Sequence, residues 1–285
     1  MSKGSLPKLI IFGNSNRKQV ANAIEEFTEF ASGKAEILSN CSVEKCESEN
    51  LESCDFAVVF GGDGAIIYAA RTLSRAKVPV IGVNLGKLGF LAEFSVDEIK
   101  KYFEFVVTGK AKIEKRLLLD CSIESDGVEK FSSIAVNDVF ITSGPPYRAI
   151  ELQAYVNKQS LAGCLSDGLI ISTPTGSTAY NLSANGPILA GEIEGFVITA
   201  ICPHSLSFRP IVISAESVVE VHGLRLNEGT TVAIDGQIPC KFAPDDVLKV
   251  RRHKGSFLVV HNPKRTQWDT LATKLRWAEK PNYKR

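Results

Sequence analysis

The strongest constraint on the fold is a short apolar run that ends in glycine. Residues 56–60 read FAVVF, followed by GGDG at 61–64 and by a helical pattern over 65–76. The next apolar run, VPVIGVNL, covers 78–85. A strand, a helix and a second strand in this order predict a parallel sheet with covering helices. In such sheets ligands bind outside the carboxyl ends of the strands, which is where Asp63 lies.

The glycines around Asp63 have a second consequence. They leave the backbone free to turn tightly and to approach a ligand closely, and their N–H groups can reach a phosphate. A Gly-Asp-Gly taken alone is more often an ordinary turn. The remaining motifs of the chain distinguish a phosphate-binding turn from an ordinary one.

The rest of the first third continues the alternation. LIIF at 9–12 predicts a buried strand. Residues 15–33 predict a helix, which Ser15 can cap and Gly33 can end. Residues 96–110 carry a further helical pattern. All of these elements fit one layered α/β domain.

The pattern changes at about residue 112. From there to about residue 260 the chain reads as short strands separated by turn residues. Asp126-Gly127 and Asn157-Lys158 each interrupt alternating segments in the manner of a hairpin turn. This predicts a second, antiparallel β domain.

We therefore predict an α/β N-terminal domain over 1–111, with a parallel, Rossmann-like sheet. An all-β, β-sandwich-like domain follows over 112–262, and a C-terminal helical tail over 263–285 packs back on the α/β domain. The tail helix is expected over 266–280, where apolar residues recur at near-helical spacing: Trp268, Leu271, Leu275 and Trp277.

Composition excludes several classes of protein. The 285 residues carry a net charge of +1, so no global field favours nucleic acid or a membrane surface. No apolar run approaches the ~18–20 residues of a spanning helix, and no signal peptide is apparent, so we expect a cytoplasmic protein. The cysteines show no CxxC pair and the histidines no HExxH, so we expect reduced thiols and no zinc site. These cysteines are Cys41, Cys46, Cys54, Cys121, Cys164, Cys202 and Cys240.

Three further stretches could carry chemistry. GVNLGKLGFLAEF at 82–94 has the glycines of a ligand-facing loop but fails the Walker pattern in spacing and in the residue after lysine. Asn137 and Asp138 interrupt an apolar run, and buried polar groups need partners. SDGLIISTPTGSTAYNLSANGPIL at 166–189 concentrates hydroxyls and glycines that suit phosphate or sugar recognition. No GxSxG motif supports a serine hydrolase.

Taken together and in order, these motifs resemble the NAD kinase family of the bacterial and archaeal type. GGDG, GVNLGKLGFLAEF, ND, STPTGSTAY, PHSLSFRPIVI and DGQ all occur, and the resemblance spans roughly residues 6–280. GGDG alone is shared with lipid and sugar kinases, whereas STPTGSTAY beside the others is specific. The resemblance implies Mg²⁺-dependent phosphorylation of the adenosine ribose 2′-hydroxyl of NAD to give NADP. The implied donor is ATP or polyphosphate, and the implied assembly is a homodimer or homotetramer.

The resemblance also implies roles for single residues. Asp63 matches the proposed general base, and Asp63 and Gly64 match contacts to NAD. Asn137 and Asp138 match an Asn-Glu pair that binds the adenosine part, with aspartate one methylene shorter than glutamate. Phe90 is a further candidate. The other implied substrate contacts are Arg148, Asp167, Thr178, Ala179, Tyr180, Asn181, Leu182, Ser183 and Gln237.

Two other functions stay open at this point. One is a lipid or sugar kinase that shares the glycine–aspartate turn, although no basic amphipathic helix for a membrane surface is present. The other is a protein that binds NAD or NADP without turnover. The sequence does not choose between ATP and polyphosphate, or between NAD and NADH.

Overall fold

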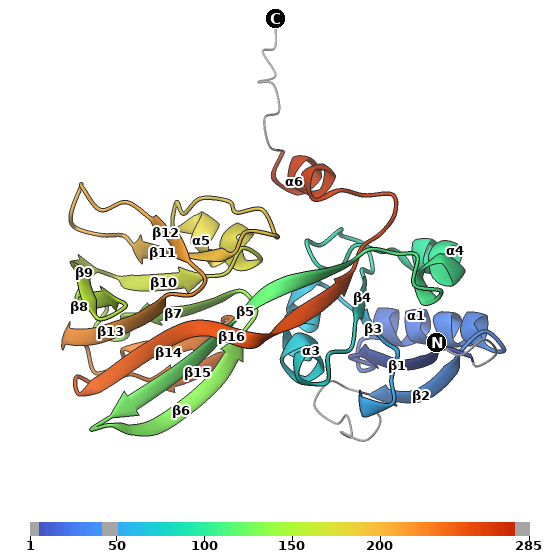
Figure 1. The fold of residues 1–285 in the computed structure, drawn as a ribbon, viewed down its shortest axis with the longest axis horizontal. Helices are drawn as coiled ribbons and strands as arrows, with labels where there is room; N and C mark the ends of the chain where they lie inside the picture. The colour runs from blue at the N-terminus through green and yellow to red at the C-terminus, as the bar shows by residue number, and fades with distance from the viewer. Residues whose placement is uncertain (1–5, 42–50, 277–285) are drawn as a thin grey trace, which may run out of the picture. The chain divides into compact units, whose positions relative to one another are not determined.

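The computed structural model describes residues 6–41 and 51–276. The chain divides into two compact units (Figure 1). Unit 1 comprises Met1–Lys115 and Phe257–Arg285, and unit 2 comprises Arg116–Ser256. Two long strands, β5 (Ile113–Ser125) and β16 (Asp246–Val260), run from one unit into the other.

Unit 1 is built on a parallel sheet. Its order is β2 (Glu36–Cys41), β1 (Lys8–Gly13), β3 (Phe56–Phe60), β4 (Val80–Val83) and the end of β16. Every pairing among them is parallel, and β16 joins through Val259 opposite Val80. β3 is buried over its whole length, as its unbroken apolar sequence predicts for a strand covered on both faces. The parallel sheet expected from the sequence is confirmed.

Among the residues that the structure describes, unit 1 carries the helices α1 (Lys18–Ala31), α3 (Asp63–Ala76), α4 (Val96–Val107) and α6 (Gln267–Leu275). α1 and α4 pack together, with the rings of Phe27 and Phe103 edge to face at 6.0 Å. The predicted cap of the first helix is wrong. α1 begins after Arg17 with no side-chain cap, three residues beyond Ser15. Gly33 follows its end with φ +73, as expected for a helix stop.

Unit 2 contains two antiparallel sheets, one of which continues through β16 into the parallel strands as a single 10-stranded sheet. In this one, β16 pairs with β13 (Val218–Arg225) on one side and with β5 on the other. Beyond β13 the sheet continues with β8 (Ile150–Val156) and then β9 (Gln159–Ser166). Beyond β5 it continues with β6 (Val128–Ala135). The other has the order β12 (Ile211–Ser214), β11 (Gly195–Ile201), β10 (Gly168–Ser172), β7 (Asp138–Thr142), β14 (Thr231–Ile234), β15 (Ile238–Lys241). Short helical turns, η2 (Gly176–Thr178) and α5 (Tyr180–Ser183), follow β10.

A single apolar core lies between the two sheets of unit 2. Leu152, Val219 and Val250 from the first sheet pack in one cluster with Ile141 and Ile171 from the second. This arrangement confirms the predicted sandwich. Both predicted hairpin turns are present as well, with positive φ at Asp126-Gly127 and at Asn157-Lys158.

Some further expectations concern cysteines and the tail. The described cysteines are all free: Cys41, Cys54, Cys121, Cys164, Cys202 and Cys240. Cys46 lies outside the described residues. So do Trp277 and the rest of the helix expected over 266–280, whose described part is α6. No helix in the described part of the chain is long and apolar enough to cross a membrane.

Candidate active site

Asp63 is placed by the turn between β3 and α3. Gly61 has φ +155, and a Cβ there would meet the Cβ of Ala65 at 2.8 Å, so the turn requires glycine. Gly62 is the N-cap of α3, and Asp63 is its first residue. The carboxylate therefore sits at the carboxyl end of a parallel strand and at the positive end of a helix dipole.

Four donors surround the Asp63 carboxylate. Oδ1 accepts the backbone N–H groups of Leu91 at 2.9 Å and Ala92 at 3.1 Å. Oδ2 accepts the N–H of Phe90 at 2.9 Å and the ammonium of Lys274 at 3.2 Å. Burial raises the pKa of Asp63, but these amides and the charge of Lys274 outweigh it and leave the pKa below its usual value. Asp63 is thus held ionised, as a proton acceptor must be.

The loop that supplies these amides is shaped around the carboxylate. A Cβ at Gly89 would lie 2.0 Å from Asp63 Oδ1, so glycine is required for the carboxylate to sit here. At the base of the loop, Asn84 Nδ2 donates to the carbonyl oxygens of Ala92 and Phe94. The stretch that the sequence suggested as a ligand-facing loop therefore positions Asp63.

A buried charge cluster anchors the end of the same loop. His261 Nδ1 lies 2.9 Å from Glu93 Oε1, and its Nε2 contacts Glu114 Oε2. The backbone N–H of Asn262 donates to Glu93 Oε2 at 2.9 Å. Hydrogen bonds to Glu114 and Glu93 raise the pKa of His261 to about 9, against the opposing effect of burial. His261 is therefore a cation near neutral pH, and it ties the Asp63 loop to β5 and to the end of β16.

In unit 2, a turn organises Asn137 and Asp138. Asp235 sits in the turn between β14 and β15 with φ +53. Its carboxylate accepts the N–H groups of Val136 at 3.0 Å, Asn137 at 2.7 Å and Asp138 at 3.2 Å. Burial, and then the charge of Asp235, raise the pKa of Asp138 to about 7. Because perturbed pKa values cluster at functional sites, the raised pKa makes Asp138 a functional-site candidate.

Most hydroxyls of the Ser/Thr-rich loop hold the loop itself. Thr173 Oγ1 donates to the carbonyl of Val136 at 2.7 Å, and Ser177 Oγ to that of Pro174 at 2.6 Å. Two buried atoms differ: Asn137 Oδ1 and Thr175 Oγ1 have no hydrogen-bond partner among the residues that the structure describes. Unpaired buried oxygens cost free energy, so these two atoms favour a polar ligand at this loop.

Tyr180 and Asn181 follow this loop and differ in role. The Tyr180 ring is 37% exposed and stands edge to face with Phe140 at 4.9 Å. Burial raises the pKa of its hydroxyl, and the charges of Cys202, Asp138 and Asp167 add to this. The Asn181 side chain is buried and engaged within the unit, with its amide on the carbonyls of Ser177 and Pro187 and its oxygen on Thr199. The Tyr180 ring is thus partly accessible, whereas the Asn181 side chain holds the loop.

The predicted site residues fall into one group in each unit. Asp63, Gly64 and Phe90 lie together in unit 1. Asp138 and Ser172 are paired residues of β7 and β10, which brings the ND motif beside the Ser/Thr-rich loop in unit 2. The remaining predicted contacts also belong to unit 2, with exposed side chains at Arg148, Ser183 and Gln237 and partly exposed ones at Asp167, Thr178, Ala179 and Leu182.

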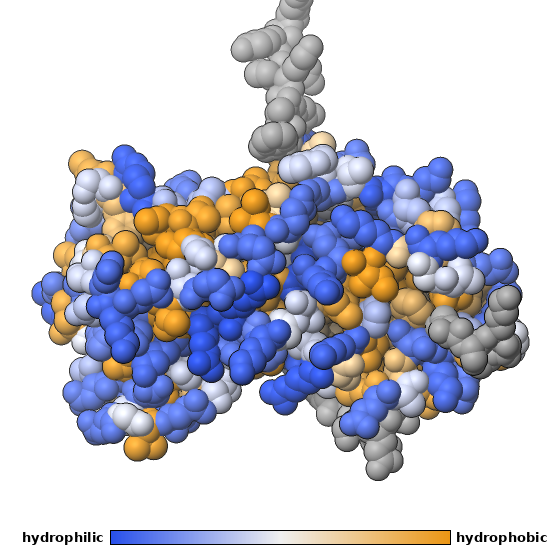
Figure 2. Space-filling view, in the orientation of Figure 1, coloured by the Kyte–Doolittle hydropathy of each residue, from blue (hydrophilic) through white to orange (hydrophobic). Residues whose placement is uncertain are grey.

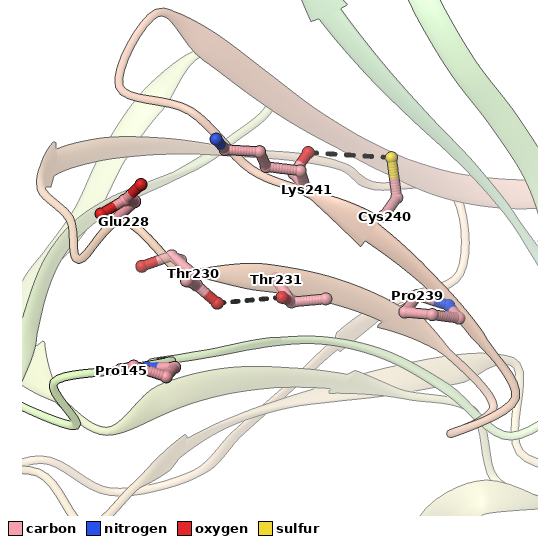
Figure 3. Close-up of a pocket in the computed structure, with 8 residues that line it drawn as sticks. Pro145, Glu228, Thr230, Thr231, Pro239, Cys240 and Lys241 are labelled. Atoms are coloured by element: carbon pink, nitrogen blue, oxygen red, sulfur yellow. Dashed lines mark hydrogen bonds between the residues drawn. The ribbon is translucent and has the colours of Figure 1, made fainter.

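One hollow of about 470 Å³ lies elsewhere in unit 2, and Figure 3 shows its lining. None of the predicted site residues lines it. Its walls come from β14, the segment that precedes β14, β15 and the turn at Pro145. The lining residues are Pro145, Glu228, Gly229, Thr230, Thr231, Pro239, Cys240 and Lys241.

Several residues of the site escaped the sequence analysis. Lys274 is 211 positions from Asp63, and His261 is 168 positions from Glu93. No local spacing links such pairs. Asp235 could have been found, since it opens the DGQ motif, in which only the glutamine was assigned a role.

Comparison with known proteins decides the family. Residues 9–111 match the family model described as "ATP-NAD kinase N-terminal domain", and residues 136–262 match "ATP-NAD kinase C-terminal domain". The chain belongs to the NAD kinase family. NAD kinase from Geobacter metallireducens is 40% identical over 226 residues, covering 79% of this chain and 80% of the relative. NAD kinase from Geotalea daltonii is 34% identical over 284 residues, covering 96% and 100%.

Two solved structures of NAD kinase type share the fold. Yeast NADH kinase complexed with NADH superimposes with a TM-score of 0.85 at 24% identity, covering 99% of this chain and 91% of that one. An NAD kinase from Archaeoglobus fulgidus in complex with ATP gives a TM-score of 0.73 at 25% identity, covering 95% and 99%. The two-domain fold expected from the sequence is the NAD kinase fold.

Proposed function

We propose that this protein transfers a phosphoryl group to the 2′-hydroxyl of the adenosine ribose of NAD, giving NADP. The observation that carries the proposal is the ionised Asp63 carboxylate between the carboxyl end of β3 and the N-terminus of α3, in a chain that matches both NAD kinase domains. Relatives that share a third or more of their sequence with this chain are NAD kinases. One neighbour of the same fold holds NADH and another holds ATP.

Asp63 acts as the general base in this proposal. A ribose hydroxyl is a poor nucleophile at neutral pH, and a carboxylate within hydrogen-bond reach can accept its proton as the phosphoryl group transfers. The backbone amides at the N-terminus of α3, including that of Gly64, favour the negative charge of donor phosphates. Phosphoryl transfer is mostly positioning and charge stabilisation, and both are available around Asp63.

The loops of unit 2 bind the dinucleotide. Asn137 and Asp138 take the adenosine part, supported by the unpartnered Asn137 Oδ1 and by the raised pKa of Asp138. Tyr180 supplies an aromatic face. Further contacts to NAD are assigned by family pattern to Arg148, Asp167, Thr178, Ala179, Asn181, Leu182, Ser183 and Gln237, and Phe90 is a further candidate. The structure favours backbone contact at Asn181, because its side chain is already engaged.

The divalent cation that the family implies finds no protein cage here. Within residues 6–41 and 51–276, no group of three or more His, Cys, Asp or Glu side chains has the arrangement of a metal site. The oxygens of Asp63 are already occupied by four donors. We therefore propose that Mg²⁺ binds with the phosphates of ATP or polyphosphate, and no step of the mechanism is assigned to a metal held by protein side chains.

We also propose a cytoplasmic homo-oligomer, a dimer or a tetramer. β12 is an edge strand, and its Ile211 and Val212 are 39% and 45% exposed. Figure 2 shows hydrophobic side chains gathered over β11 and β12. An exposed apolar edge strand is a pairing surface. Light scattering after size-exclusion chromatography should give a multiple of the 31.0 kDa chain mass, and the mass of a single chain would contradict this.

Replacing Tyr180 should affect binding more than turnover. In Tyr180→Ala we expect the KM for NAD to rise several-fold with a smaller fall in kcat, because stacking contributes about equally in ground and transition states. Tyr180→Phe keeps the ring against Phe140 and serves as the matched control, with a KM close to that of the wild type. Steady-state kinetics at saturating ATP checks both. An unchanged KM in Tyr180→Ala would remove Tyr180 from the site.

A ligand panel separates this function from the alternatives. Binding raises the unfolding temperature in proportion to the logarithm of ligand concentration over Kd. We expect NAD and NADP to stabilise the protein, and sugar phosphates and lipid vesicles to have no effect. Stabilisation by sugar phosphates or lipids alone would favour another kinase with the GGDG turn. Stabilisation by NAD, with no NADP formed when ATP or polyphosphate is added, would favour a protein that binds NAD without turnover.

A further inference from the structure

The helix α6 carries one side chain into the candidate site. Lys274 Nζ lies 3.2 Å from Asp63 Oδ2 and 4.5 Å from the centroid of the Phe90 ring. The side chain is 29% exposed. An ammonium held by both a carboxylate and an aromatic face is more constrained than an ordinary surface lysine.

The start of α6 is fixed by contacts that do not involve Lys274. Thr266 and Asp269 form a capping box. Arg265, just before the helix, donates to Glu98 Oε1 at 2.7 Å. Leu271 is buried within unit 1. These contacts set the position of the helix, so the fold does not depend on the ion pair between Lys274 and Asp63.

The hydrogen bonds at Asp63 limit how a substrate can bind there. Three of the four donors are backbone amides of the loop that Asn84 and Glu93 hold in place. A hydroxyl that gives its proton to Oδ2 needs a free acceptor position. The amides cannot leave without moving the loop, whereas a lysine side chain can rotate about its own bonds. Lys274 is therefore the donor that an incoming hydroxyl displaces.

We propose that Lys274 is a further catalytic residue, which gives up Asp63 Oδ2 to the acceptor hydroxyl and then binds the phosphoryl group being transferred. The proposal rests on the kinase function above. A ribose hydroxyl oxygen that hydrogen-bonds to Asp63 Oδ2 lies about 2.7 Å from it. The Lys274 ammonium starts 3.2 Å from the same Oδ2, so it can reach the oxygens of a phosphoryl group that bonds to this hydroxyl oxygen. Lysine has three N–H donors, so it can hold the phosphoryl group without deprotonation.

With ATP as donor, the ribose 2′-oxygen forms a bond to the γ-phosphorus. The bond from that phosphorus to the β–γ bridging oxygen breaks and leaves its electron pair on ADP. The hydroxyl proton passes to Asp63 Oδ2 and later to water. Lys274 stays protonated throughout, and its charge offsets the negative charge that the phosphoryl oxygens carry in the transition state.

The test compares Lys274→Met with Lys274→Arg and with Lys264→Met, an exposed lysine in the turn before α6. Removing one such donor costs about 10²–10³-fold in kcat by analogy with other charge-stabilising sites. We expect Lys274→Met to lose kcat to that extent with a KM for NAD within threefold and an unchanged unfolding temperature. Lys274→Arg should recover part of kcat, and Lys264→Met should behave as the wild type.

Two results would overturn the role of Lys274 alone. One is a kcat within threefold of the wild type in Lys274→Met. The other is a loss of kcat matched by a lower unfolding temperature and not recovered by arginine, which would mark a structural role. A wild-type protein that binds NAD but forms no NADP would instead overturn the kinase function, and this role with it.

Discussion

Asp63→Asn should abolish most turnover while leaving NAD binding measurable. Loss of a general base costs about 10²–10⁴-fold in rate. Asparagine has nearly the same shape, but its amide nitrogen cannot accept the hydrogen bonds that the loop amides and Lys274 donate to Asp63. We therefore expect kcat to fall by at least about 10²-fold. If the loop also shifts, the fall should approach about 10⁴-fold.

The measurement pairs steady-state kinetics with calorimetric titration of NAD. A KM or Kd for NAD within a few-fold of the wild-type value, together with the loss of kcat, would assign Asp63 to the chemical step. Near-normal kcat in Asp63→Asn would remove Asp63 as the base. Glu52→Gln, an exposed carboxylate outside the site, is the matched control and should leave both values unchanged.

The second large effect concerns stability and depends on His261. The side chains of His261, Glu93 and Glu114 are only 13%, 8% and 10% exposed. The folded-state pKa of His261 is raised to about 9 from the usual 6.5. A raised histidine pKa stabilises the folded state fully below about pH 6.5, and this contribution is lost as pH rises through 9. At 1.36 kcal/mol per pH unit, the contribution is on the order of 3 kcal/mol.

Urea unfolding at pH 6, 7, 8 and 9.5 tests this. Trp268 lies in α6, within unit 1, so its fluorescence follows that unit. We expect the unfolding free energy to fall by about 3 kcal/mol between pH 6.5 and 9.5. His261→Gln should be less stable at pH 7 and lose this slope, whereas His204→Gln, at an exposed position, should keep it. An unchanged slope in His261→Gln would contradict the assignment.

Local pattern sufficed for much of the fold. The apolar runs of β3 and β4 with a helical pattern between them predict parallel strands. A helix between two strands of one sheet carries the chain back to the edge where the first strand began, so the second strand runs in the same direction as the first. Asp126-Gly127 and Asn157-Lys158 predict hairpins because they interrupt alternating segments, and both pairs have the positive φ of hairpin turns in the structure. Each of these predictions depends on neighbouring residues alone.

What failed or was missed depends on distant residues. Ser15 is a good capping residue by type, yet α1 begins at Lys18. The end of β16 enters the parallel sheet beside β4, about 180 residues earlier in the chain, and no local signal records that. In the Ser/Thr-rich loop, Thr173 and Ser177 donate to the backbone carbonyls of Val136 and Pro174, and the composition of the loop does not predict these contacts.

The candidate site shows the same division. GGDG predicts a role for Asp63, and the family pattern predicts roles for Asn137 and Tyr180, because the motifs carry those residues. The donors that control the Asp63 carboxylate come from Leu91, Ala92 and Lys274, which no motif marks as its partners. Their contribution follows from three-dimensional packing, and only the structure reveals it.

The most direct test of the central claim is the identity of the product. The purified protein is incubated with NAD, Mg²⁺ and either ATP or polyphosphate, and the product is examined by ³¹P NMR and by an NADP-specific dehydrogenase. We predict a 2′-phosphomonoester that the dehydrogenase accepts as NADP, absent from the Asp63→Asn reaction. If the protein binds NAD but the NAD is recovered unchanged with both donors, the result would contradict the account.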